Sequence, residues 1–336
     1  LGLLLAWRRT GAGAPLRLAL AVLLVFVAAS WVLPELLWRL EGVRADALFH
    51  RFAEDSRLCT SRRVLWSNML TLIAQKPWLG WGWGELDYAH YVTLFPGERF
   101  CVLLDNAHNL PLHLAVELGV PAAAALCGGV LAWVLGQRPW CETAPARQLA
   151  WGVLAIIGLH SLLEYPLWYG PFQVVALLSA ALLLWPRKAV LSGRGAGIAG
   201  LGAALVVAVC GFAAWDYFRV SQLYKSNAQR AAAYREGTQA KVGHSVLFSN
   251  QLDFARLTTT APTRENAQRV HALARDLLHY SPEPRVIEAL IESAVLLGRD
   301  DEAAFHMKRY RIAYPKDYAR WADVRADRVR PASGTP

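Results

Sequence analysis

Five stretches of this chain are long and uncharged enough to cross a lipid bilayer, and they constrain its fold more than any other feature. A transmembrane helix needs about 20 predominantly apolar residues. The stretches cover residues 16–33, 110–136, 149–163, 166–185 and 195–215. In the run "EYPLWYGP" (164–171), prolines and a glycine predict a tight hairpin between the third and fourth stretches. The chain is therefore predicted to be an all-α, polytopic membrane protein with about five visible transmembrane helices.

The composition agrees with a membrane protein. Of the 336 residues, 55% are hydrophobic and 14 are Trp, and the mean hydropathy is +0.25. The net charge of +9 would suit a nucleic-acid partner, but the basic residues flank the apolar runs instead of forming one block. We therefore expect contact with membrane lipid and no nucleic acid. The chain begins with Leu1 and shows no signal-peptide pattern, so we expect it to be the carboxy-terminal part of a longer protein.

The basic residues in the short loops predict an orientation. Three clusters fall on one side, which the positive-inside rule makes cytoplasmic. They comprise Arg8, Arg9 and Arg17, then Arg138 and Arg147, then Arg187, Lys188 and Arg194. We predict four regions: a stub and first visible span (1–37), a large external loop (38–109), a four-helix membrane region (110–215) and an external helical tail (216–336).

The external loop is predicted to contain an amphipathic helix followed by a glycine-aromatic run. Apolar residues recur at helical spacing in "RRVLWSNMLTLIAQK" (62–76), and Pro77 ends the pattern. This helix could lie on the membrane surface. The aromatic residues of "PWLGWGWGELDYAHY" (77–91) could stack on sugars or form an interfacial belt, and the run lacks the strand-turn-helix context of a nucleotide site. Cys59 and Cys101 share this loop and could form a disulfide.

Polar residues gather where the second stretch begins, in "DNAHNLPLHLAVELG" (105–119). On a helix starting near Asn109, the side chains of Asn109, His113 and Glu117 share one face at i, i+4 spacing. They predict an inward-facing polar stripe, which either joins helices or lines a site. His108 lies at the aqueous end, where an imidazole can take a proton from an incoming hydroxyl.

The same spacing recurs in the hairpin, where His160 and Glu164 are also i, i+4. This pair again predicts either a packing contact or part of a site. A metal held by these His and Glu residues is possible, but nothing in the spacing selects one, so no metal is expected.

In combination these motifs resemble the O-antigen ligase and polymerase superfamily of bacteria. "HNLPLHLAVELG" (108–119) resembles its His-Asn signature, which a glycine ends, and residues 62–91 resemble the loop before that signature. "HSLLEYPLWYGPF" (160–172) resembles the carboxy-terminal block of the protein O-oligosaccharyltransferase (pilin-glycosylation ligase) branch. The resemblance covers about residues 1–220.

The resemblance implies a GT-C-like ligase fold and a glycosyltransferase at the periplasmic face of the bacterial inner membrane. Such an enzyme takes a glycan from undecaprenyl diphosphate and gives it to a hydroxyl, without metal or cofactor. We favour Ser or Thr of a periplasmic acceptor protein such as a pilin. The alternatives are ligation to lipid A core and polymerisation of O-antigen. A transporter or a non-catalytic scaffold is also conceivable, although charges here cluster at the outer edge instead of at mid-membrane.

The expected mechanism is a single displacement with inversion at the anomeric carbon. His108 is the candidate base or orienting group. Arg62, four residues before Trp66 as in the family pattern, is expected to bind the diphosphate leaving group. The candidate substrate-binding residues are Arg63, Arg99, Asn109, His160, Glu164 and Tyr165.

The tail contains a pattern typical of helical repeats. Pro282 and Pro315 each follow a helix that ends with Tyr, and they lie 33 positions apart, near the tetratricopeptide period. The segment 286–315 resembles one helical hairpin with Gly298 at the turn. Because one and a half repeats cannot bury a solenoid core, we expect the tail to pack on itself or on the membrane domain. It either presents the acceptor protein or caps the fold.

Overall fold

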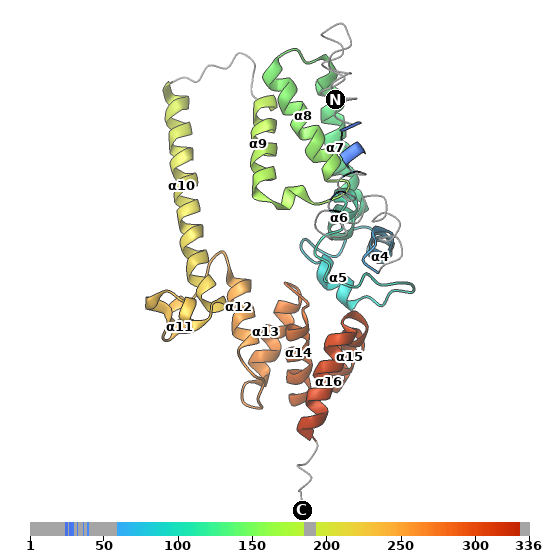
Figure 1. Ribbon diagram of the computed structural model, residues 1–336, viewed down its shortest axis with the longest axis vertical. Helices are drawn as coiled ribbons and strands as arrows, with labels where there is room; N and C mark the ends of the chain where they lie inside the picture. The colour runs from blue at the N-terminus through green and yellow to red at the C-terminus, as the bar shows by residue number, and fades with distance from the viewer. Residues whose placement is uncertain are drawn as a thin grey trace, which may run out of the picture. The chain divides into compact units, whose positions relative to one another are not determined.

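The computed structural model describes residues 59–184 and 193–329 continuously, together with scattered residues between positions 24 and 39 (Figure 1). Within these parts every regular element is a helix, as predicted, and no strand occurs. The helices pack as two units. Unit 1 consists of Leu1–Leu86 and Phe95–Arg187, and unit 2 consists of Asp87–Leu94 and Lys188–Pro336.

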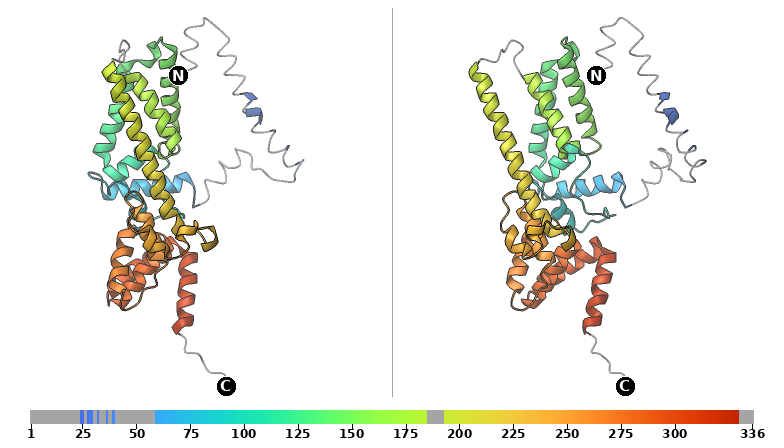
Figure 2. Two further views of the ribbon diagram at one scale, coloured as in Figure 1. Left: turned by 90° about the vertical axis from the view of Figure 1, so that its left-hand side faces the viewer. Right: turned by 60° about the vertical axis from the view of Figure 1, so that its left-hand side comes forward.

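Unit 1 contains the α8–α9 helical hairpin and the consecutive helices α6 and α7. Its helices are α4 (Arg62–Gln75), α6 (Leu110–Leu118), α7 (Val120–Gln137), α8 (Pro145–His160) and α9 (Gly170–Leu184). Helices α8 and α9 lie side by side (Figures 1 and 2), and their connection contains a short 3-10 helix, Pro166–Trp168. The predicted hairpin is therefore confirmed. Helix α4 confirms the predicted loop helix, which begins after the cap Ser61 and ends before Pro77.

Two helices among the described residues are long and apolar enough to cross a membrane. They cover Val120–Cys141 and Gly200–Tyr224, and α9 is a shorter apolar helix. The predicted span 16–33 lies largely outside the described residues, and those of its residues that are described are helical. The prediction of one continuous helix over 110–136 is wrong. Helices α6 and α7 are separate, because Gly119 between them has a φ of +85°.

The break at Gly119 exists because the glycine-aromatic run packs backbone to backbone against it. A Cβ on Gly119 would lie 2.3 Å from the carbonyl oxygen of Trp78, and a Cβ on Gly80 would lie 2.3 Å from the carbonyl oxygen of Glu117. Three backbone hydrogen bonds close the contact, from Trp81 N to Val116 O (2.8 Å), Gly82 N to Glu117 O (2.9 Å) and Val120 N to Pro77 O (2.8 Å). These glycines therefore serve close packing.

The segment that leads to His108 is fastened to α4. The sequence left open whether Cys59 and Cys101 are bridged, and the structure contains this disulfide. On the buried face of α4, Asn68 donates a hydrogen bond to the carbonyl oxygen of Glu98 (2.9 Å) and accepts one from the N–H of Phe100 (2.8 Å). A covalent link and a buried amide thus hold this return segment in register with α4.

Unit 2 is a set of packed helices. They are α10 (Gly193–Ser221), α11 (Thr238–Val242), α12 (Ser249–Thr258), α13 (Ala267–Leu278), α14 (Pro284–Leu296), α15 (Asp300–Ala313) and α16 (Pro315–Val329). Helices α14 and α15 form the predicted hairpin. Its turn contains Gly298 with a φ of +67°, and Ala303 is buried at the contact.

A piece of the segment 38–109 belongs to the core of unit 2. This piece is most of α5 (Leu86–Val92), and its Tyr91 is buried among apolar residues of α13, α14 and α15. The Tyr91 hydroxyl lies 3.2 Å from Nδ1 of His306, and Arg309 donates to the carbonyl oxygen of Val92 (2.7 Å). Burial lowers the pKa of His306 to about 4. The tail thus packs on itself and on a loop segment about 200 residues away in sequence.

Candidate active site at the mouth of helix α6

His108 occupies a left-handed backbone position directly before α6. Its φ is +48°, a conformation that costs a residue with a Cβ about 1–2 kcal/mol. The side-chain oxygen of Asn106 accepts a hydrogen bond from the His108 N–H (3.0 Å), which supports this conformation. Asn109 is the N-cap, and its side-chain oxygen accepts from the N–H of Leu112 (3.0 Å). These bonds therefore fix the backbone that carries the imidazole.

The α8–α9 hairpin is joined to the mouth of α6 by three hydrogen bonds. Backbone N–H of Leu110 donates to Ser161 O (2.8 Å), and the amide of Asn109 donates to Leu162 O (3.0 Å). The third bond joins the two candidate functional groups: His108 Nδ1 lies 2.7 Å from Glu164 Oε2. The two backbone-mediated bonds fix the hairpin, so the carboxylate meets the imidazole in one arrangement.

Helix α4 contributes Arg62 and Trp66, which lie one turn apart. Arg62 forms an ion pair with Glu164 and donates to the carbonyl oxygens of Leu163 and, weakly, His108 (3.4 Å). The indole N–H of Trp66 donates to Ala107 O (3.2 Å). Helix α4 and the α8–α9 hairpin thus both contact residues 107 and 108 before α6, and Arg62 binds both the hairpin and His108.

The charge of Glu164 determines what the imidazole can do. Burial alone would raise the pKa of Glu164, but the hydrogen bonds and charges of His108 and Arg62 outweigh it and lower that pKa below 4.5. An ionised Glu164 accepts a hydrogen from Nδ1 and so leaves Nε2 of a neutral ring as a proton acceptor. No described residue binds Nε2, and the His108 side chain is 29% exposed. The site can therefore accept a proton from a bound hydroxyl.

One predicted pairing is wrong. His160 and Glu164 were expected to pair at i, i+4, but α8 ends at His160 and the chain turns there. The Glu164 carboxylate faces His108 and Arg62, and the exposed His160 ring lies edge-on to Phe172 at 5.7 Å. A role for His160 in substrate binding stays a prediction.

The other predicted residues are placed as follows. Tyr165 meets the His108 ring edge-on at 4.9 Å. Arg63 is exposed on α4 next to Arg62, and the Arg99 guanidinium lies 5.7 Å from the Phe95 ring. Both polar atoms of Asn109 bind the backbone, as described above. Substrate binding by these four residues stays a prediction.

His113 and Glu117 form the predicted inward-facing pair. Their side chains are 3% exposed and their nearest atoms, Nε2 and Oε2, are 3.4 Å apart. Trp168 covers the imidazole edge-on at 4.8 Å. Because no open surface reaches this pair, the structure favours a packing role for it.

Sequence reasoning missed Asn106 and Trp66. The signal for Asn106 was present, because Asn two residues before a residue with positive φ is typical of a side-chain-to-backbone turn. Nothing in the sequence indicates that Trp66 reaches the carbonyl oxygen of Ala107, 41 residues later.

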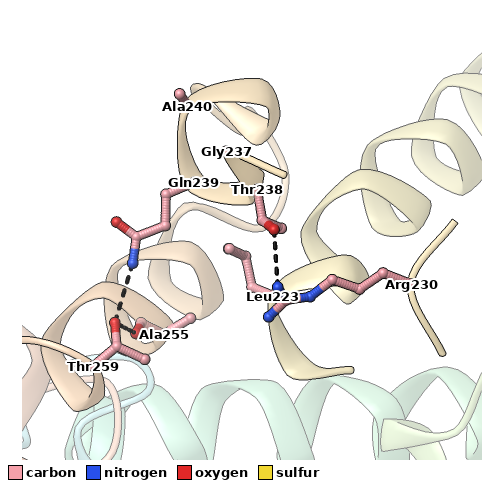
Figure 3. A pocket seen from close by; sticks show the side chains of 8 residues that line it. All are labelled: Leu223, Arg230, Gly237, Thr238, Gln239, Ala240, Ala255 and Thr259. Carbon is pink, nitrogen blue, oxygen red and sulfur yellow. Dashed lines mark hydrogen bonds between the residues drawn. The ribbon is translucent and has the colours of Figure 1, made fainter. Parts of the chain in front are cut away.

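Unit 2 contains a separate concavity of about 440 Å³ (Figure 3). Its polar groups bind each other: Arg230 donates to Thr238 (3.0 Å) and Gln239 donates to Thr259 (3.1 Å). The Arg230 guanidinium is bonded to its neighbours, and no carboxylate, imidazole or thiol is among the residues that line the concavity, so it suggests no chemistry.

Two family models match the chain. The model described as "Virulence factor membrane-bound polymerase, C-terminal" matches residues 148–328, more than half of the chain. The model described as "O-Antigen ligase" matches residues 1–127. The first match includes Glu164 and Tyr165, and the second includes Arg62 and His108. The two groups of site residues therefore fall in two separate family matches.

A curated relative points the same way. The general O-oligosaccharyltransferase of Acinetobacter baylyi is 31% identical over 111 residues, which is 33% of this chain and 19% of that protein. The match thus spans only about a fifth of the relative's length. No solved structure matches this chain.

Proposed function

We propose a function that starts from one premise: this chain belongs to the O-antigen ligase superfamily, whose members are membrane proteins that transfer glycans. On this premise, the chain moves an oligosaccharide from undecaprenyl diphosphate to a Ser or Thr hydroxyl of a periplasmic protein such as a pilin. The similarity to a general O-oligosaccharyltransferase supports a protein acceptor.

The observation that carries the proposal is the His108–Glu164 pair, 2.7 Å apart, with Arg62 bound to the same carboxylate. Glu164 holds Nδ1–H, and Nε2 takes the proton of the acceptor hydroxyl. The hydroxyl oxygen then attacks the anomeric carbon, and the bond from that carbon to the diphosphate oxygen breaks. The diphosphate leaves with the bonding electron pair, so the configuration inverts. The chemistry requires no metal.

The diphosphate needs positive charge, and α4 supplies it at the site. Arg62 uses only part of its five N–H donors on Glu164 and the two carbonyl oxygens, and its side chain is 37% exposed. Its remaining donors, with exposed Arg63 beside it, bind the leaving group. Arg62 therefore has two functions, since it also holds the carboxylate that orients His108.

The proposed setting is the bacterial inner membrane. The chain crosses it several times, with five spans in the visible part, and its external loop and tail face the periplasm. The charge pattern of the loops and the two long apolar helices support this arrangement. The α13–α16 helices form a tetratricopeptide-like tail that presents the acceptor protein.

The family names also favour a second candidate with the same chemistry and another acceptor. A hydroxyl of lipid A core would make the chain an O-antigen ligase, and a hydroxyl of a growing glycan would make it a polymerase. The His108 mechanism applies to all three acceptors.

One experiment separates these acceptors. The full-length gene is deleted in its host, and the strain is complemented with the wild type or with His108→Ala. We expect deletion to remove glycopeptides detected by mass spectrometry and to leave the lipopolysaccharide ladder intact, with rescue by the wild type only. Loss of the ladder with intact glycopeptides would overturn the protein acceptor. Full rescue by His108→Ala would overturn the catalytic assignment.

A further inference from the structure

The hairpin tip holds a row of aromatic rings that begins at the candidate base and ends in solvent. Tyr165 meets the His108 imidazole edge-on, with centroids 4.9 Å apart and an interplanar angle of 87°. Tyr169 stacks on Tyr165 at 5.5 Å and 24°. Tyr169 is 52% exposed, and no other ring among the described residues contacts it. One face of Tyr169 stacks on Tyr165, and about half of the Tyr169 surface is exposed.

This row is held in place by its backbone. The N–H of Tyr169 donates to Pro166 O (3.0 Å), and its carbonyl oxygen accepts from the N–H of Gln173 in the first turn of α9 (3.1 Å). Tyr165 directly follows Glu164, which His108 and Arg62 hold. A hydrogen bond with Tyr169, and then burial, raise the pKa of Tyr165 to about 12, so its hydroxyl stays neutral at physiological pH. Two backbone hydrogen bonds and the contact with Tyr165 therefore position the Tyr169 ring.

Two ligand chemistries use exposed aromatic rings at such a place. A lipid interface accepts Trp and Tyr at the end of an apolar helix, and α9 is apolar. A pyranose ring has an apolar C–H face that fits against a flat ring and hydroxyls that bind phenols. A tyrosine that only anchors the helix at the lipid interface does not need to stack on a ring that contacts the His108 imidazole. The row from His108 outward therefore favours the sugar.

We propose that Tyr169, supported from behind by Tyr165, is a saccharide-stacking subsite that takes a pyranose ring of the donor glycan. This inference rests on the proposed function only in that the bound sugar belongs to the glycan to be transferred. Tyr165 acts as a positioning residue, because it joins the subsite to the imidazole.

The test compares three substitutions in the full-length protein reconstituted in nanodiscs. Tyr169→Phe keeps the flat ring, and Tyr169→Leu keeps an apolar side chain without a ring face. Phe172→Leu is the matched control, because Phe172 is 37% exposed at the start of α9 and lies outside the row. With the host's lipid-linked oligosaccharide as donor, we expect Tyr169→Leu to raise the donor KM about tenfold with kcat nearly unchanged. Tyr169→Phe keeps the ring but loses the hydroxyl that bonds Tyr165, so its donor KM should rise less than that of Tyr169→Leu. Phe172→Leu should resemble the wild type.

A second measurement does not depend on transfer. Saturation-transfer NMR with methyl glycosides of glucose, galactose and N-acetylglucosamine is recorded on His108→Ala, with and without Tyr169→Leu. We expect the signal of at least one glycoside to fall when the ring is lost. If Tyr169→Leu changes neither the donor KM nor this signal, the subsite does not exist. If only the yield of protein in the membrane falls, and Phe172→Leu lowers it equally, the rings are lipid anchors and the proposal is wrong.

The two proposals fail in different ways. A chain that transfers its glycan to lipid A core, with a raised donor KM in Tyr169→Leu, would overturn the protein acceptor and keep the subsite. Transfer to protein, with an unchanged donor KM in Tyr169→Leu, would keep the protein acceptor and overturn the subsite.

Discussion

Two His–Glu pairs lie close together in this chain and differ in almost every physical respect. His113 and Glu117 come from one helix, are 3.4 Å apart and are 3% exposed. His108 and Glu164 come from two elements 56 positions apart in sequence, are 2.7 Å apart and are 29% and 39% exposed. The residue types are the same, but only the second pair can be reached by a substrate.

Whether the glutamate lies on the same helix as the histidine or on another element determines what the pair can do. A pair at i, i+4 forms whenever the helix forms, so burial turns it into a packing contact. A pair between elements needs both backbones to be held, as Arg62 and Asn109 hold them here. Such an arrangement fixes which imidazole nitrogen is free.

The largest effect expected is a loss of transfer in His108→Ala with little change in stability. A positioned proton acceptor contributes about 10²- to 10⁴-fold to a rate. The rate per folded molecule should fall by about that factor in membranes that hold equal amounts of protein. His113→Ala is the matched comparison and should retain the rate per folded molecule. Equal losses of rate in the two variants would contradict the distinction between the pairs.

Glu164→Gln tests the orienting carboxylate. The neutral amide can bond either nitrogen of the ring, so we expect transfer to fall about 10- to 100-fold, less than for His108→Ala. Because the pKa of Glu164 is lower in the folded chain, its contacts stabilise the fold above pH 4.5 and cease to do so as the pH falls through the lowered pKa.

The stability part of this prediction is small, at most about 1 kcal/mol for such an exposed group. Thermal unfolding of the wild type and Glu164→Gln should differ at pH 7 and converge toward pH 3. A difference that grows on acidification would show that Glu164 is not held as an anion.

Glu117→Leu sharpens the comparison from the buried side. It leaves His113 without its partner in a buried place, where Nδ1 also has no partner among the described residues. We expect a loss of about 1–3 kcal/mol of unfolding free energy. Adding His113→Leu should recover part of it, since two apolar groups need no partners. Chemical denaturation in detergent measures both, and a more damaged double variant would argue against a packing role.

The smallest effect is expected for Asn106→Ala, which removes the acceptor for the His108 N–H. One hydrogen bond contributes about 1 kcal/mol, so transfer should fall about fivefold through loss of orientation. Asn106→Asp keeps that acceptor and loses an Nδ2 that has no partner among the described residues, but it adds a carboxylate at a position that is 3% exposed. The rate per folded molecule should therefore be higher in Asn106→Asp than in Asn106→Ala, with the donor KM unchanged in both variants. Equal loss in the two variants would rule out positioning through this bond.

Features that depend on neighbours within a few residues followed from the sequence. Pro77 ends α4, Gly298 turns the α14–α15 hairpin, and Pro166 and Gly170 mark the tip between α8 and α9. The position of His108 before a helix was also predictable, because Asn109 and Pro111 are typical of a helix start. Local turn and capping energies determine all of these.

Contacts between distant segments did not follow from the sequence. The i, i+4 spacing predicted that the side chains of His160 and Glu164 would pair. Helix α8 ends at His160, so the two side chains do not share a helix face. The packing of Tyr91 beside His306, 215 positions away, has no local signal. The break of the predicted 110–136 helix was missed because it depends on Gly80 approaching the backbone at Glu117.

The pattern of residues along the chain was enough to predict a helical protein, apolar runs that suit a bilayer and an imidazole at the start of a helix. Hydropathy and helix-ending residues act within a turn or a segment, so they can be read along the chain. Only the tertiary structure decided that Glu164 and Arg62 meet at His108 while His113 is enclosed. Those pairings arise where segments distant in sequence come into contact. A glycine permits such a close contact, but its presence in the sequence does not indicate which segment it will contact.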